Sequence, residues 1–178
     1  EAGIEPDWVA GISIGAINSA IIAGNAPEAR IAQLRSFWQQ VTAAPDLGFA
    51  GNPAASLVDD WLALWQGDTA RGWANRLTAA RTMVVGAPGF FATRVPPPLF
   101  RASGAEGATS FYDASGLKTT LEALVDFDRI NAPAAMRFSV GAVNVGTGNF
   151  AYFDNRSTRI RAEHVMASGA LPPGFDEI

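Results

Sequence analysis

The chain of 178 residues contains no cysteine and a single histidine, His164. Without cysteine it can form neither disulfides nor thiolate metal ligands, and one histidine is too few for a multi-histidine metal site. We therefore expect no metal ion in the function of this protein.

Charge is scarce as well. Charged residues make up 17% of the sequence, the formal net charge is −4, and the 13 lysines and arginines are scattered along the chain. Because phosphate binding needs a clustered positive face, nucleic acid is not an expected partner. Hydrophobic residues make up 48%, an ordinary balance for a globular protein, and the length suits one domain with a substantial core.

Neither end of the sequence resembles the end of a domain. The first residue is Glu1, nothing near it resembles a signal peptide, and "EAG" is typical of the last residues of a helix. At the other end, "LPPGFDEI" stops without a closing element. We therefore expect residues 1–178 to be a single partial domain, an internal piece of a longer one. The missing signal peptide favours a cytoplasmic or membrane-peripheral protein whose true N-terminus lies outside this chain.

The spacing of apolar residues predicts alternating strands and helices. An apolar run over residues 8–12 is typical of a buried parallel strand, and small or apolar residues over 14–23 indicate a buried helix. Alternation with a period of two predicts two more strands, over residues 136–142 and 150–153. Further helices are predicted near residues 31–41, 57–65, 73–84 and 117–125, with a short one that ends near Gly169. The mixture predicts an α/β domain.

Residues 86–112 interrupt this pattern. They include three consecutive prolines and several glycines, so we expect no regular element there. Phe90, Phe91, Leu99 and Phe100 within the segment are nevertheless large and apolar. Two interpretations stay open, namely a lid or binding loop, and a coil that its aromatic side chains pin to the domain.

One short motif carries chemistry. Gly11-Ile12-Ser13-Ile14-Gly15 matches G-x-S-x-G, with a predicted strand before it and a predicted helix after it. A sharp turn between strand and helix lifts a serine hydroxyl clear of the backbone, where a base can activate it as a nucleophile. We expect both flanking glycines to avoid clashes that a Cβ would cause, and the backbone N–H of Ile14 to face the oxyanion. The sequence thus predicts Ser13 as a catalytic nucleophile.

Two other interpretations compete for the same stretch. Residues 8–27 are 20 consecutive residues without a charge, and Gly11 and Gly15 form the G-x-x-x-G pattern of packed membrane helices. Against a membrane span, the polar residues Ser13, Asn18 and Ser19 lie inside the stretch. The second alternative is a purely structural turn in which Ser13 is chemically idle.

The sequence offers one candidate triad around this serine. Ser13, Asp154 and His164 follow one another in the chain order that many serine hydrolases use. His164, however, lies in "RAEHVMAS", which is predicted to be helical, whereas a triad histidine normally lies on a loop. We therefore favour His164 as a polar residue on the capped side of a helix, and keep the Ser–Asp–His triad as an alternative.

Two longer stretches, "GISIGAINSAIIAGN" at 11–25 and "ASGALPPGF" at 167–175, together resemble the patatin-like phospholipase family of the bacterial type. The resemblance extends to Phe37-Trp38 and to "SFYDASGLKTTLEALVDFDRIN" at 110–131, and so covers most of the chain. It implies a serine acyl hydrolase of lipid or phospholipid esters with a three-layer α/β/α fold and a Ser–Asp dyad. It also implies no catalytic histidine, no metal and no other cofactor, and a peripheral contact with membranes. Ser13 matches the family's nucleophile.

Two parts of the family pattern have no counterpart in these residues. A Gly-rich oxyanion loop is expected before Glu1, and the dyad aspartate, in an Asp-Gly-Gly or Asp-Gly-Ala motif, is expected after Ile178. Asp176 comes too early and is not followed by glycine, so the role is not transferred to it. We therefore expect residues 1–178 alone to be inactive. The non-enzymatic alternative is a pseudoenzyme that binds lipid or a partner.

Overall fold

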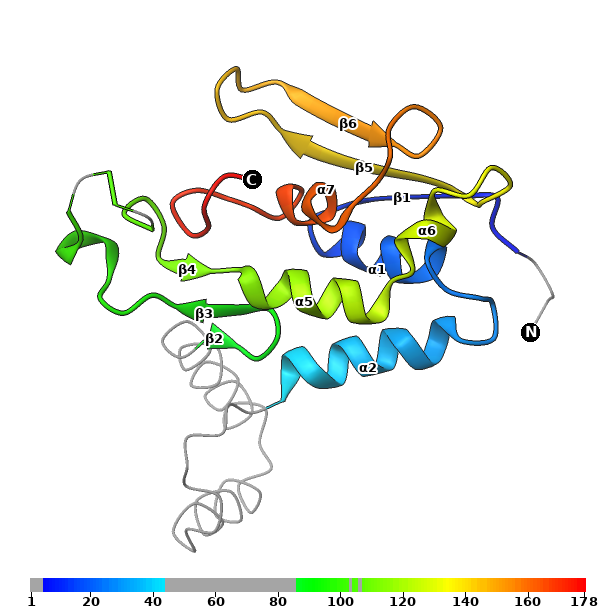
Figure 1. Cartoon of the computed structure of the whole chain (residues 1–178), viewed down its shortest axis with the longest axis horizontal. Helices are drawn as coiled ribbons and strands as arrows, with labels where there is room; N and C mark the ends of the chain where they lie inside the picture. Colours follow the sequence, from blue (N-terminus) through cyan, green and yellow to red (C-terminus); the bar gives the residue numbers. More distant parts are fainter. Residues whose placement is uncertain (1–4, 44–85, 103, 106) are drawn as a thin grey trace, which may run out of the picture.

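The structure is a computed structural model that describes residues 5–43, 86–102, 104–105 and 107–178 (Figure 1). The helices predicted near residues 57–65 and 73–84 lie outside the described residues. The other predicted helices and strands all fall within them.

The main sheet contains three strands in the order β1-β5-β6. β1 (Trp8–Ile12) runs parallel to β5 (Arg137–Val143), and β6 (Phe150–Asp154) returns antiparallel to β5. In the register of this sheet, Gly11 pairs with Val140, which in turn pairs with Phe153. The three strands predicted from apolar runs and alternation are thereby confirmed, each to within one residue at either end. The predicted burial of residues 8–12 is wrong, because β1 alternates between exposed and partly buried residues.

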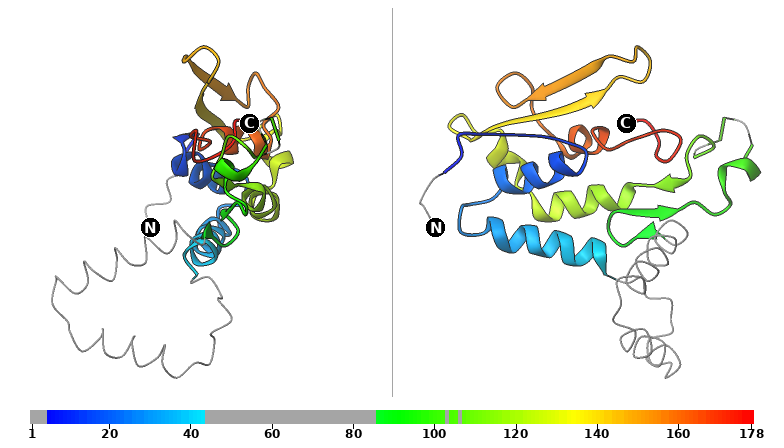
Figure 2. Two further views of the ribbon diagram at one scale, coloured as in Figure 1. Left: turned by 90° about the vertical axis from the view of Figure 1, so that its left-hand side faces the viewer. Right: turned by 180° about the vertical axis from the view of Figure 1, so that it is seen from behind.

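Helices pack on one face of this sheet. They are α1 (Ile14–Ala23), α2 (Arg30–Thr42), α5 (Ser115–Leu124), α6 (Phe127–Ile130) and α7 (Ala162–Ala167). Figures 1 and 2 show the β1-β5-β6 sheet along one side of the molecule, with α1 directly against it and α5 and α2 farther away. Strands and helices together confirm the predicted α/β class.

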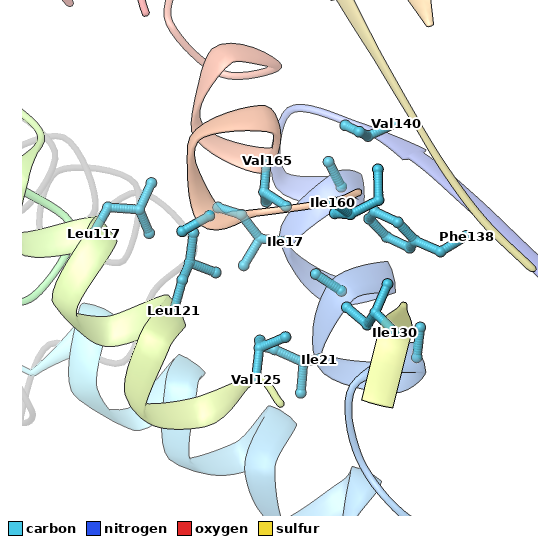
Figure 3. Packing of buried hydrophobic residues seen from close by; sticks show 14 of the residues in the cluster. Ile17, Ile21, Leu117, Leu121, Val125, Ile130, Phe138, Val140, Ile160 and Val165 are labelled. Atoms are coloured by element: carbon cyan, nitrogen blue, oxygen red, sulfur yellow. The ribbon is translucent and has the colours of Figure 1, made fainter. Parts of the chain in front are cut away.

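The core lies between this helical layer and the sheet. Phe138 and Val140 of β5 are fully buried, and Figure 3 shows them on the side of the strand that faces α1. They pack in one cluster with side chains of α1, α2, α5, α6 and α7 and of the residues that flank these helices. Its larger members include Ile17, Ile21, Phe37, Leu117, Leu121, Val125, Ile130, Ile160 and Val165. This burial is the main stabilising contribution, because apolar area removed from water contributes roughly 25 cal/mol per Å².

The opposite face of the sheet carries large exposed apolar side chains beside a polar group made of Arg137, Ser139 and Asp154. Along each strand, alternate residues point away from the helices. They include Trp8, Ile12, Val143, Phe150 and Tyr152, all of them exposed. Among the described residues, no helix covers this face (Figures 1 and 2).

Our expectation of no regular element in residues 86–112 was wrong. β2 (Gly86–Ala87), β3 (Phe91–Thr93) and β4 (Tyr112–Asp113) form a small antiparallel sheet, and a 3₁₀ turn, η1 (Pro98–Phe100), follows β3. The glycines and prolines lie between or at the edges of these strands, where they permit turns instead of preventing a ladder. Packing between aromatic residues, such as Phe91 on Tyr112 at 4.8 Å between ring centroids, stabilises such short strands.

The membrane-span interpretation of residues 8–27 was wrong as well. The charge-free stretch divides into a strand, a turn at Ser13 and the ten-residue helix α1. In the part of the chain that the structure describes, no helix combines the length and apolarity needed to cross a membrane.

Candidate active site

Ser13 occupies the turn between β1 and α1. Its backbone dihedrals are φ 54° and ψ −125°, and it is the only described residue other than glycine with a positive φ. Such a conformation costs a residue with a side chain about 1–3 kcal/mol and persists only where the surrounding structure holds it. The setting of strand, tight turn and helix is the one that the G-x-S-x-G motif predicts.

The two glycines of the motif differ in what they allow. A Cβ at Gly11 would lie 2.2 Å from the backbone C and O of Gly15, so only glycine lets the end of β1 lie this close to the start of α1. A Cβ at Gly15 would meet nothing within 4 Å among the described residues. The expected clash is therefore confirmed at Gly11 and wrong at Gly15, which lies on the open side of the helix.

A second serine ties the turn to the sheet. The hydroxyl of Ser168, directly after α7, accepts a hydrogen bond from the backbone N–H of Ser13 at 2.8 Å. The same hydroxyl donates to the carbonyl oxygen of Gly141 in β5 at 2.5 Å. Ser168 thus fixes the backbone of Ser13 relative to the neighbouring strand. Sequence reasoning missed this residue, whose only signal was its place in "ASGALPPGF".

Helix α1 begins at this turn with free backbone donors. The carbonyl oxygen of Ser13 accepts from the N–H of Ala16 at 2.9 Å and of Ile17 at 3.3 Å. Within the described residues, the N–H groups of Ile14 and Gly15 have no acceptor. They carry the positive end of the helix dipole and can stabilise an anion that forms beside Ser13. This geometry fits the oxyanion role predicted for Ile14.

An apolar pocket of about 120 Å³ lies beside Ser13. Of the described residues that line it, only Ser13 has a polar side chain. The others are Ile14, Ile17, Phe90, Ala114, Leu117, Val165, Met166, Gly169, Ala170, Phe175 and Ile178. A charged group would find no partner on such walls, whereas a hydrocarbon chain would replace water there favourably.

Part of the pocket wall comes from the segment 86–112. Phe90 lines the pocket and packs against the buried cluster, with its ring 6.5 Å from that of Phe37. Phe91 does not line the pocket itself but packs on Phe175, which does, with 5.6 Å between the ring centroids. These contacts favour the pinned interpretation for the first part of the segment. Leu99 and Phe100, later in the segment, are exposed.

Asp154 does not lie near Ser13. It pairs with Ser139, which pairs with Ala10, so it is two strands away and three residues back along β1, roughly 14 Å from Ser13. Its carboxylate accepts hydrogen bonds from Ser139 Oγ at 2.7 Å and Arg137 Nε at 2.8 Å. Burial raises the pKa of Asp154, but these donors and the N–H of Arg156 outweigh burial and lower the pKa overall.

His164 does not line the pocket either. It is the third residue of α7, and its Nδ1 accepts a hydrogen bond from the backbone N–H of Arg161 at 3.0 Å, which caps the helix. Its ring packs on Phe153, with 4.6 Å between centroids. The prediction of a polar residue on the capped side of a helix is confirmed. The structure does not bring Ser13, Asp154 and His164 together.

Asp176 is likewise engaged elsewhere. Its carboxylate forms an ion pair with Arg94 at 2.5 Å and accepts a hydrogen bond from Thr109 at 3.2 Å. Burial raises the pKa of Asp176, but hydrogen bonds from Ser110 and Thr109 and the charge of Arg94 lower it overall. Among the described residues that line the pocket, none has a titratable side chain.

A family model described as "Patatin-like phospholipase" matches residues 1–178, the whole chain. Neither the comparison with curated proteins nor the comparison with solved structures found a match.

The two glycines of the turn form a matched pair for testing. We expect Gly11→Ala to destabilise the protein by about 1–3 kcal/mol or more, because the added Cβ meets backbone that cannot move aside. We expect Gly15→Ala to be neutral or stabilising by up to about 1 kcal/mol, since alanine favours a helix. Denaturant unfolding of both variants measures the difference, and equal stabilities would contradict the close approach of β1 and α1.

The cap at His164 predicts a pH dependence. Burial and the nearby charge of Arg161 lower the pKa of His164 in the folded protein below its usual 6.5. As the pH decreases, His164 is therefore protonated in the unfolded chain before it is protonated in the folded protein. The contribution of the neutral His164 to the free energy of unfolding is fully present above pH 6.5, and it is lost as the pH decreases toward the pKa of the folded protein. Because His164 is the only histidine, His164→Gln, which can keep the cap, should flatten the stability profile just below pH 6.5. Identical slopes in both proteins would exclude this role.

Proposed function

The chain belongs to the patatin-like phospholipase family, and on that premise we propose that Ser13 is the nucleophile of a lipid acyl hydrolase. One observation carries the proposal: Ser13, on a turn with positive φ, has the only polar side chain among the described residues that line the apolar pocket. An ester placed there would have its carbonyl carbon beside the hydroxyl and its acyl chain against hydrocarbon walls.

The reaction is acyl transfer in two steps. A base takes the proton of Ser13 while Oγ attacks the ester carbonyl carbon, and the carbonyl oxygen becomes an oxyanion. The N–H groups of Ile14 and Gly15 stabilise that oxyanion, a contribution of a kind whose removal typically costs on the order of 10²–10³ in rate. The alcohol leaves with the proton, and water then frees the fatty acid by the same sequence of events.

We further propose that the base is an aspartate outside these 178 residues. Asp154 and Asp176 are each engaged in ion pairs with arginine, and His164 caps α7. No described carboxylate or imidazole is hydrogen-bonded to Ser13 Oγ, which supports a dyad completed by another segment. On this proposal residues 1–178 alone, without the base and the Gly-rich oxyanion loop, do not turn over esters.

We propose that the complete domain has three layers, with a second layer of helices on the exposed face of the β1-β5-β6 sheet. Trp8, Ile12 and Tyr152 on that face support the proposal, because a second layer of helices would remove these large exposed apolar side chains from water.

A non-catalytic lipid-binding module is the second candidate. It is favoured by one observation, the lack of any described base in contact with Ser13. Both candidates use the same apolar pocket, so binding of lipid does not separate them. Covalent reactivity of Ser13 does.

The decisive measurement is therefore labelling of the complete protein with a serine-directed fluorophosphonate. We expect Ser13→Ala to abolish both labelling and ester hydrolysis, since no other described side chain can act as the nucleophile in this pocket. His164→Ala is the control, and it should keep labelling and most of the activity because a dyad does not use an imidazole.

Three outcomes would contradict the proposal. Labelling that survives Ser13→Ala would exclude Ser13 as the nucleophile. A loss of activity on the order of 10³ in His164→Ala would favour the triad instead. Turnover of p-nitrophenyl esters by residues 1–178 alone, if it depends on Ser13, would show that the base lies within this chain.

Ser168 is expected to act as a positioning residue. Ser168→Ala removes the acceptor of the Ser13 N–H and with it the bridge from the turn to Gly141. We expect kcat to fall at least about tenfold with little change in KM, because the nucleophile is displaced while the pocket is intact. Ser168→Thr, which keeps the hydroxyl, should restore part of kcat. An unchanged kcat in Ser168→Ala would show that the turn holds without this bridge.

A further inference from the structure

We propose that residues 95–100, here called the apolar tip, bind the surface of the lipid aggregate that supplies the substrate. The inference rests on the proposed function, because it explains how an apolar substrate reaches the pocket. It assigns to these residues a role separate from that of Phe90, which lines the pocket itself.

The apolar tip exposes more of its large side chains than any other described segment. Val95 is 85% exposed, Leu99 84% and Phe100 79%. These are the three highest values among the exposed large hydrophobic residues of the described chain. A concentration of apolar side chains in water marks a contact site more often than it marks an idle surface.

The backbone of the apolar tip is suited to an apolar medium. Pro96, Pro97 and Pro98 carry no N–H, so they leave no donor to be satisfied. The N–H of Phe100 donates to the carbonyl oxygen of Pro97 at 2.9 Å, within η1. Because unsatisfied backbone donors strongly disfavour entry into hydrocarbon, the three prolines and this hydrogen bond lower the cost of placing the segment in a lipid surface.

Charge around the apolar tip favours a lipid surface over a second copy of this chain. Arg94 and Arg101 flank it, and no acidic residue occurs between residues 86 and 105. Arg94 is paired with Asp176, while Arg101 Nε donates to the carbonyl oxygen of Pro96, which keeps the Arg101 charge at the base of the tip. Positive charge beside exposed apolar side chains matches an interface whose anionic head groups lie next to hydrocarbon.

The apolar tip is connected directly to the pocket. Figure 1 shows η1 at one end of the molecule, beyond β3 and β4, which lead back toward the helical layer. Phe91 of β3 packs on Phe175, and both Phe175 and the adjacent Phe90 belong to the pocket side of this small sheet. A tip held in a lipid surface therefore holds the pocket wall close to that surface.

The experiment measures binding to vesicles without turnover. The complete protein carrying Ser13→Ala is sedimented with vesicles of equal parts phosphatidylcholine and phosphatidylglycerol, with and without Leu99→Ser and Phe100→Ser. We expect the two serines to lower the partition coefficient at least about tenfold, since each replaced side chain contributes a sizeable apolar area. The control is Ile31→Ser with Val145→Ser, two exposed apolar residues of α2 and the β5–β6 turn, and it should bind as the parent does.

The outcomes separate this inference from the proposed function. Equal partition of the tip variant and the control variant would overturn the inference, even if Ser13 proves to be the nucleophile. A tip variant that changes only the self-association measured by sedimentation equilibrium would identify a contact between copies and would also overturn it. When Leu99→Ser and Phe100→Ser are introduced into the protein that keeps Ser13, hydrolysis of p-nitrophenyl acetate should equal that of the parent protein. A soluble short ester needs no lipid surface. A matching loss on that substrate would mean that the tip is only structural.

Discussion

The close approach of β1 and α1 at Gly11 is the constraint on which the rest of the site depends. Without a side chain at Gly11, the chain turns from strand into helix within one residue, and that residue, Ser13, takes a positive φ. The turn places the Ser13 side chain at the pocket and the first free N–H groups of α1 beside it. This one backbone contact therefore fixes the position of the Ser13 side chain, the position of the free N–H groups beside it and the direction in which α1 leaves the turn.

This strained turn is held from two directions. Below it, the buried face of α1 packs with Phe138 and Val140 of β5, so the helix cannot slide along the sheet. Beside it, the hydroxyl of Ser168 connects the backbone of Ser13 to Gly141 of the same strand. A conformation that costs a few kcal/mol by itself is stable when packing and hydrogen bonds fix both of its ends. Such rigidity is what a nucleophile that must meet a carbonyl in one orientation requires.

The apolar side chains of residues 86–112 divide into two groups with different surroundings. Phe90 and Phe91 face the domain and form or support the pocket wall, whereas Val95, Leu99 and Phe100 face water. Phe91 is the first residue of β3, and the water-facing residues follow after this strand ends at Thr93. A single proline-rich segment can in this way both shape an apolar pocket and present an apolar surface outside it.

Sequence by itself determined the local features of this protein. Periodicity located β1, α1, α2, α5, β5 and β6, because strand and helix patterns of two and 3.6 residues are properties of neighbouring positions. The G-x-S-x-G motif and the longer stretches around it were enough to indicate the family. Only the tertiary structure decided the features that depend on residues far apart in the chain. The bridge from Ser168 to Ser13, the separation of Asp154 from the turn and the sheet within residues 86–112 all depend on which distant segments meet. Patterns of neighbouring residues do not specify these long-range contacts, because the contacts follow from how the apolar faces of whole helices and strands pack together.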